Sequence, residues 1–172
     1  MTGHVGAGEE LADGAPVIEA TKVIRACQQA AVTLATAESV TAGLVAATLA
    51  EVPGCSAVLR GGVVAYATDI KERVLGLPAP VLEHVVSEEV ACQMAESVAG
   101  LLEATMGLAT TGVAGPDWLD GQPPGTAWIA VHDRRGAGRT VSALVQVTGD
   151  RAAVRAQVVR ACLGLAMRAI TE

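Results

Sequence analysis

Residues 35–43 read Ala-Thr-Ala-Glu-Ser-Val-Thr-Ala-Gly and separate an apolar, β-branched run at 32–34 from an apolar run with helical spacing at 44–49. This order predicts a strand, a tight polar turn and a helix. It places Glu38, Ser39 and Thr41 at the carboxyl end of a strand, where the N–H groups of the next helix can bind an anion. Two interpretations stay open here: Ser39 or Thr41 only caps the helix, or the turn belongs to a catalytic site.

The composition indicates a core of small aliphatic side chains. The 172 residues are 51 % hydrophobic, but only 2 % are aromatic and none is Phe. Such a core suits helices packed on a parallel sheet better than an aromatic-rich β-sandwich. The net charge of −6 argues against a nucleic-acid-binding surface. The longest charge-free stretch, 104–116, is too short to span a bilayer, and no signal peptide is recognised, so we expect a cytoplasmic protein without a membrane partner.

Cysteine and histidine spacing offers no metal site. The four cysteines, at 27, 55, 92 and 162, stand far apart without a Cys-x-x-Cys pair, and the three histidines are equally scattered. This pattern favours reduced thiols over disulfides or zinc ligands.

Further along the chain, we expect a loose tail at 1–14 and one domain over 15–172. Apolar periodicity predicts helices through 17–31, 70–75, 87–102 and 150–165, the last two capped by Ser87 and Asp150. Strands are predicted at 57–67, interrupted by glycines 61–62 and closed by Tyr66, at 106–111, and as a hairpin at 126–132 and 140–148. The order fits helices enclosing a mixed sheet, parallel at its centre with an antiparallel hairpin.

Three predicted loops, at 38–41, 66–71 and 111–117, are expected to meet at one sheet edge. A serine there needs a base, and because no Ser-His-Asp arrangement is apparent, Lys71 is the nearest candidate. A lysine base must be neutral, which requires burial or a nearby cation to lower its pKa. Tyr66 could relay a proton or hold the lysine. The alternatives are a solvated Lys71 and an ordinary aromatic residue at a strand end.

Arg151 and Arg155 lie in the first turns of the predicted final helix, where positive side chains oppose the helix dipole. Either these long side chains lean away, helped by Asp150, or an anion such as a phosphate binds beside them.

These motifs resemble those of the CinA carboxy-terminal domain family, which includes the bacterial nicotinamide-nucleotide amidohydrolases (PncC). Thr36–Gly43 is similar to the family signature Thr-Ala-Glu-Ser-Cys-Thr-Gly-Gly. The order and spacing of further motifs extend the resemblance from about residue 17 to 170. These motifs lie at Val52–Ser56, Gly61–Tyr66, Lys71, Val86–Ala91, Thr111–Asp117, Pro124–Trp128 and Gly149–Arg151.

The resemblance implies an α/β fold, a three-layer α/β/α sandwich with a mixed, largely parallel sheet. It also implies hydrolysis of the carboxamide of nicotinamide mononucleotide to nicotinate mononucleotide and ammonia, without a metal or cofactor. Ser39 would be the nucleophile, Lys71 the base and Tyr66 an assisting residue. The residues expected to bind this pyridine nucleotide are Glu38, Thr41, Gly43, Thr111, Gly112, Ala114, Gly115 and Arg151. Family members commonly associate, so we also expect a homo-oligomer.

Several positions depart from the family pattern near the expected site. Val40 and Ala42 replace a Cys and a Gly, and an alanine is unfavourable if φ is positive there. Ala67 and Thr68 replace a usual Ser-Asn pair, and Trp118-Leu119 replaces small residues. The alternative function is therefore a catalytically impaired CinA-like module that binds a nucleotide or a partner without turnover.

Overall fold

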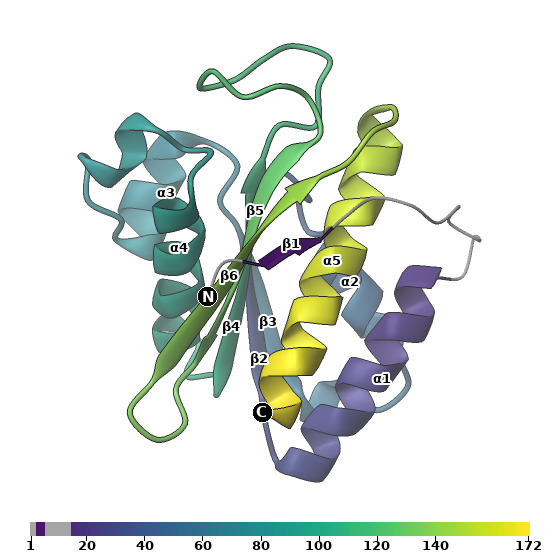
Figure 1. Cartoon of the computed structure of the whole chain (residues 1–172). Coiled ribbons are helices and arrows are strands. Elements are labelled where there is room, and N and C mark those ends of the chain that lie inside the picture. Colours follow the sequence, from purple (N-terminus) through teal and green to yellow (C-terminus); the bar gives the residue numbers. More distant parts are fainter. Residues whose placement is uncertain (1–2, 6–14) are drawn as a thin grey trace.

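A computed structural model describes residues 3–5 and 15–172, and it shows a mixed sheet between two layers of helices (Figure 1). The strand order is β1-β6-β5-β4-β2-β3. The strands are β1 (Gly3–Val5), β2 (Leu34–Glu38), β3 (Leu59–Val64), β4 (Met106–Gly112), β5 (Thr126–Asp133) and β6 (Arg139–Gln146). The three-layer α/β fold is therefore confirmed.

The strands β4, β2 and β3 run parallel, whereas β5 is antiparallel to both β4 and β6. The mixed, largely parallel sheet is confirmed, and its parallel part extends from β4 through β2 to the edge strand β3. The hairpin of β5 and β6 occupies the other half of the sheet, since β5 pairs directly with β4.

Helices cover both faces of the sheet, and each face has its own core. On one face lie α1 (Ala15–Ala30), α2 (Leu44–Ala50) and α5 (Arg151–Thr171), and on the other lie α3 (Thr68–Leu75) and α4 (Glu88–Leu101) (Figure 1). Two short 3₁₀ helices span Cys55–Ala57 and Val81–Glu83. The predicted capping residues of α4 and α5 are confirmed: Ser87 accepts a hydrogen bond from the Val90 N–H, and Asp150 accepts one from the Ala153 N–H.

Two strand boundaries differ from the prediction. β2 begins at Leu34 and continues through Glu38, so the turn starts four residues later than expected. All five residues of β2 are buried between β3 and β4, and the small side chains at 35–37 give no alternating pattern. β3 is shorter than predicted and ends at Val64, which leaves Tyr66 in the following loop.

The expected irregularity in β3 is confirmed. The register between β2 and β3 shifts between Leu34 and Ala35, opposite Leu59 and Gly61. Gly62 lies directly against the Thr36 side chain, so a Cβ at this position would clash with the Thr36 hydroxyl.

The amino-terminal tail was expected to be loose over 1–14. Residues 3–5 instead form β1, which pairs parallel with β6 and covers the open edge of the hairpin. Residues 1–2 and 6–14 lie outside the described part of the chain. Among the described helices, none is both long enough and apolar enough to cross a membrane.

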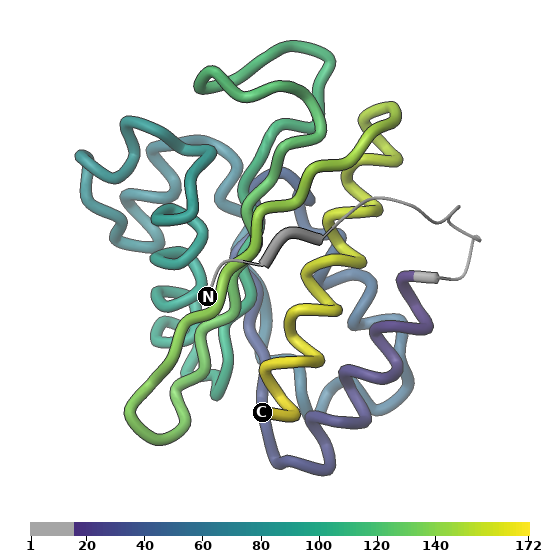
Figure 2. Tube along the Cα trace, in the orientation of Figure 1, coloured from purple at the N-terminus to yellow at the C-terminus, as the bar shows by residue number. Residues whose placement is uncertain are grey.

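The parallel strands bring three connecting segments to one edge of the sheet. Figure 2 shows the chain leaving the carboxyl ends of β2, β3 and β4 at the same end of the molecule. The segments after these strands are 39–43, 65–67 and 113–125. This edge therefore carries the candidate site.

Candidate active site

The turn after β2 presents Ser39 to a pocket and is attached to β4. The Ser39 N–H donates a hydrogen bond of 2.9 Å to the Thr110 carbonyl. This bond removes the Ser39 N–H from the possible donors for an oxyanion. In the described part of the chain, no acceptor contacts the neighbouring Val40 N–H, which makes it the better candidate donor.

Glu38 performs the capping that the sequence suggested for Ser39 or Thr41. The N-cap position of α2 is Gly43, which makes no side-chain capping bond. The buried Glu38 carboxylate instead accepts from the N–H groups of Gly43, Val45 and Ala46 at 2.8–2.9 Å. A carboxylate at a helix N-terminus is favoured by both these hydrogen bonds and the helix dipole.

The orientation of the hydroxyl groups beside Glu38 follows from counting protons. Thr41 donates its single hydroxyl proton to Glu38 at 2.7 Å, so the Thr110 hydroxyl must be the donor in its 2.7 Å contact with Thr41. Arg155 donates to the Thr41 carbonyl at 2.8 Å. Glu38, Thr41 and Gly43 therefore shape the turn, and they do not line the pocket as expected for substrate-binding residues.

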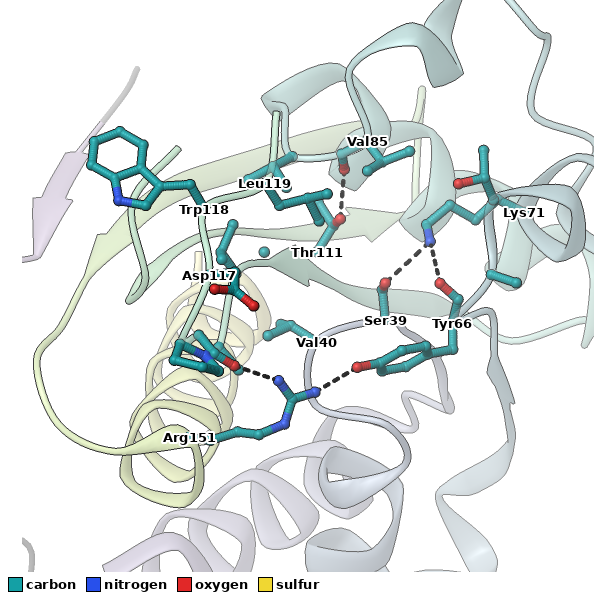
Figure 3. A pocket seen from close by; sticks show the side chains of 18 residues that line it. Ser39, Val40, Tyr66, Lys71, Val85, Thr111, Asp117, Trp118, Leu119 and Arg151 are labelled. Carbon is teal, nitrogen blue, oxygen red and sulfur yellow. Dashed lines mark hydrogen bonds between the residues drawn. The ribbon is translucent and has the colours of Figure 1, made fainter. Parts of the chain in front are cut away.

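Lys71, on α3, is only 1 % exposed, so its interpretation as a solvated helix residue is wrong. Its Nζ donates to Ser39 Oγ at 3.1 Å and to the Tyr66 carbonyl at 3.2 Å (Figure 3). It also donates to the Ala65 carbonyl at 2.8 Å. Burial lowers the pKa of Lys71 from 10.5 to about 8, against an opposing contribution from the Asp120 carboxylate. A substantial fraction of the amine is then neutral near pH 8 and can accept the Ser39 proton.

The pocket at this edge has a volume of about 450 Å³. The predicted residues that line it are Ser39, Tyr66, Lys71, Thr111, Gly112, Ala114, Gly115 and Arg151. These residues come from the end of β4, from the segments after β2, β3 and β4, and from α3 and α5, so the predicted meeting of three loops is confirmed.

Tyr66 contacts Arg151 rather than the serine. Its hydroxyl accepts a 2.6 Å hydrogen bond from Arg151 Nη2, while Arg151 Nη1 donates to the Gly115 carbonyl at 2.7 Å (Figure 3). Tyr66 holds Lys71 through its main-chain carbonyl, a contact that does not need the phenol ring. The two arginines at the start of α5 thus lean away from the helix axis toward carbonyl and hydroxyl oxygens.

None of the four residues in the outer wall of the pocket was predicted to bind substrate, although Trp118 and Leu119 were expected near the site. Val85 and Val86, which precede α4, line it together with Trp118 and Leu119 from the loop after β4. The Thr111 hydroxyl donates to the Val85 carbonyl at 2.6 Å, which joins β4 to this wall. The resemblance motif Val86–Ala91 pointed to this segment, but it assigned no pocket role to either valine.

The departures from the family pattern occupy defined places. Val40 and Ala67 line the pocket, and Ala67 is the N-cap residue of α3 without a side-chain capping bond. Ala42 has a φ of 49°, so the expected strain at this alanine is confirmed. Within residues 3–5 and 15–172, no three His, Cys, Asp or Glu side chains are grouped so that they could hold a metal ion.

Comparisons with known proteins show which family this chain is similar to. The family model described as the CinA C-terminal domain matches residues 18–170. A CinA-like protein from Frankia casuarinae is 45 % identical over 142 residues, which are 81 % of this chain and 32 % of that protein. The chain spans about a third of the length of the curated relatives it matches.

Solved structures also resemble the whole fold. A CinA superfamily protein from Klebsiella pneumoniae 700603 is 33 % identical with a TM-score of 0.84, covering 91 % of this chain and 98 % of that one. The competence/damage inducible protein CihA from Agrobacterium tumefaciens is 30 % identical with a TM-score of 0.87, covering 95 % of this chain and all of that one. On the strength of the family match and these likenesses, the chain belongs to the CinA C-terminal domain family.

Proposed function

We propose that this protein hydrolyses the carboxamide of nicotinamide mononucleotide to nicotinate mononucleotide and ammonia. The observation that carries the proposal is the 3.1 Å contact between the buried Lys71 amine and Ser39 Oγ inside a pocket. A serine beside a lysine whose pKa is lowered is a known variant of nucleophile and base.

In this reaction, Ser39 Oγ attacks the amide carbon while neutral Lys71 takes the hydroxyl proton. Lys71 then returns this proton to the leaving nitrogen, and ammonia departs as the C–N bond breaks. Water hydrolyses the resulting ester and restores the serine. The Val40 N–H, together with the N–H groups of Ala114 and Gly115, is the proposed donor set for the oxyanion, since the Val113 N–H is bonded to the Thr126 carbonyl.

Arg151 is the proposed ligand of the substrate phosphate. Two of the five guanidinium N–H groups are used by Tyr66 and Gly115, so three remain for phosphate oxygens. Its Tyr66 contact orients the guanidinium at the pocket wall, and the Tyr66 hydroxyl proton stays available for an acceptor on the substrate.

Ammonia release from nicotinamide mononucleotide tests the proposal. We expect turnover by the wild type, and a loss of about a thousandfold or more in Ser39→Ala and Lys71→Met, since both residues act on the same proton transfer. Lys22→Met is the matched control because Lys22 lies exposed on α1 and should keep full activity.

Trapping separates this proposal from a binding module without turnover. Hydroxylamine should intercept an acyl group on Ser39 and give the hydroxamate of the nicotinate nucleotide. Nucleotide binding with no ammonia release by the wild type, and with affinity unchanged in Ser39→Ala, would favour the module instead.

A further inference from the structure

The loop between β4 and β5 contains a small hairpin of its own. Leu119 and Gln122 exchange two main-chain hydrogen bonds, of 3.2 and 2.8 Å. The two residues between them, Asp120 and Gly121, have φ values of 52° and 71°. Two positive φ values in a two-residue turn define a type I′ turn, for which Asp-Gly is a preferred pair. The local sequence Asp-Gly therefore favours this hairpin.

The tip of this hairpin is attached to the segment before α4. Asp120 Oδ2 accepts a 3.0 Å hydrogen bond from the Val86 N–H, and no other acceptor contacts this N–H in the described part of the chain. A hydrogen bond to a carboxylate is stronger than one between neutral groups. Asp120 thus joins two segments that are separated in the sequence and that both line the pocket.

The attachment forms one side of the pocket. In Figure 3, Leu119 lies beside Val85 and Thr111, whereas the Trp118 ring points outward. Trp118 is 67 % exposed and stands at the rim. The Thr111 hydroxyl holds Val85 through a hydrogen bond to its main-chain carbonyl. Among the hydrogen bonds of the described residues, the Asp120–Val86 bond alone joins this hairpin to the segment before α4.

We propose that Asp120 is a positioning residue that holds the Leu119–Gln122 hairpin against Val86, so that Leu119 forms a pocket wall that selects the part of the substrate beyond the amide. The inference rests on the proposed function for its substrate but on the Asp120–Val86 contact for its geometry. Asp120 itself does not line the pocket and acts through Leu119. Its carboxylate also lies near Lys71, where it favours the protonated amine and raises the pKa.

Two substitutions separate the hydrogen bond from the charge. Asp120→Gly removes the acceptor but keeps a pair of residues suited to the type I′ turn. Asp120→Asn keeps a carbonyl acceptor and tolerates positive φ, but it removes the charge. Hydrogen exchange at the Val86 amide then reports the attachment directly, with the Val90 amide as internal reference because Ser87 caps it independently.

In Asp120→Gly we expect Val86 exchange to accelerate about ten- to a hundredfold, as the loss of a bond to a charged group implies. In Asp120→Asn the acceleration should stay below a few fold. An unchanged Val86 rate in Asp120→Gly overturns the proposal, and so does equal acceleration in both variants, because the charge alone would then explain the effect.

Kinetics test the selective wall. Asp120→Gly should raise KM for nicotinamide mononucleotide about tenfold and lower kcat much less. The ratio of kcat/KM for nicotinamide mononucleotide to kcat/KM for free nicotinamide should fall by a similar factor. Asp120→Asn should keep the KM within a few fold. An unchanged preference in Asp120→Gly, with Val86 exchange accelerated, overturns the wall. Absence of turnover by the wild type would refute the proposed function, while the exchange measurement would still decide the attachment.

Discussion

Lys71 is one of two lysines in the chain, and the other, Lys22, is exposed on α1. Protein labelled with ¹³C at lysine therefore gives two resolvable side-chain signals, assigned with Lys22→Arg. We expect the Lys71 signal to titrate with a midpoint near pH 8, because burial disfavours its charged form. Amide hydrolysis should rise with pH through the same midpoint. A Lys71 midpoint near 10.5 would contradict the buried base.

The same shift makes stability depend on pH. Between about pH 8 and 10.5 the unfolded chain keeps a proton on Lys71 that the folded protein has lost, so this group's contribution to the unfolding free energy rises with pH. Across that window the wild type should gain about 3 kcal/mol relative to Lys71→Met. Burial also raises the pKa of the Cys27, Cys92 and Cys162 thiols, so their contribution to the unfolding free energy falls at alkaline pH. The wild type and Lys71→Met share this effect, so it cancels in the comparison. A difference that stays constant with pH, measured by urea unfolding, would refute the assignment.

Ala42 stores strain in the turn that presents Ser39. Its φ of 49° lies in the left-handed region, which costs an L-residue roughly 1–2 kcal/mol, whereas glycine adopts it freely. After subtracting the larger entropy of glycine in the unfolded chain, we expect Ala42→Gly to raise the unfolding free energy by about 0.5–1 kcal/mol. Urea unfolding measures this, and Ala42→Val should shift the midpoint in the opposite direction.

At the residue level, the resemblance pointed to Ser39 and Lys71, whose side chains lie 3.1 Å apart, but it could not predict the role of Glu38. A glutamate six residues before a helix can either contact a substrate or cap that helix. Which role it takes depends on whether the turn brings the start of the helix back to the end of β2. The capping by Glu38 depends on three N–H groups whose direction is set by the tertiary fold. Asp120 was missed for the same reason, since its partner Val86 lies far away in the sequence.

At the level of elements, Thr36 in β2 and Thr110 in β4 are both buried but have different environments. The Thr36 hydroxyl has no hydrogen-bond partner, whereas the Thr110 hydroxyl donates to Thr41. We expect Thr36→Val to raise the unfolding free energy by about 1 kcal/mol because it removes an unsatisfied polar group. Thr110→Val should lower it by about 1 kcal/mol through loss of a made hydrogen bond. Thermal unfolding of both variants checks the opposite signs, and equal shifts would contradict the assigned partners.

Elements with a clear period were predicted well, and elements without one were not. The apolar stripe of α1 and the capping residues of α4 and α5 each specify a helix locally. The start of β2 and the end of β3 depend instead on pairing with neighbouring strands, as the register shift opposite Gly61 shows. Likewise β1 exists because β6 offers an open edge, which no local pattern at 3–5 indicates.

At the scale of the whole molecule, two cores enclose one sheet, and the site lies where both meet the carboxyl edge of the strands. Val40 belongs to the core beneath α1, α2 and α5, whereas Ala65 and Leu75, close to Lys71 in sequence, belong to the core beneath α3 and α4. Ser39 and Lys71 are thus supported from opposite faces of the sheet. A loss of packing in either layer should displace one partner of the pair. The expected homo-oligomer stays a prediction.

The distance between the α4 layer and the sheet depends on the absence of a side chain at Gly107. A Cβ on this β4 residue would overlap the carbonyl of Ala95 in α4, which is main chain and cannot rotate away. Gly164 in α5 is the matched control, since a Cβ there meets no atom within 4 Å. We expect Gly107→Ala to lower the unfolding free energy by about 3 kcal/mol through overpacking. Gly164→Ala should raise it by about 1 kcal/mol through helix propensity. Urea unfolding followed by circular dichroism compares the two variants.

Because α4 must move as a body to admit the methyl group, Gly107→Ala should also accelerate hydrogen exchange at Val86, just before α4. Unaltered stability in Gly107→Ala would show that the two layers can separate without cost.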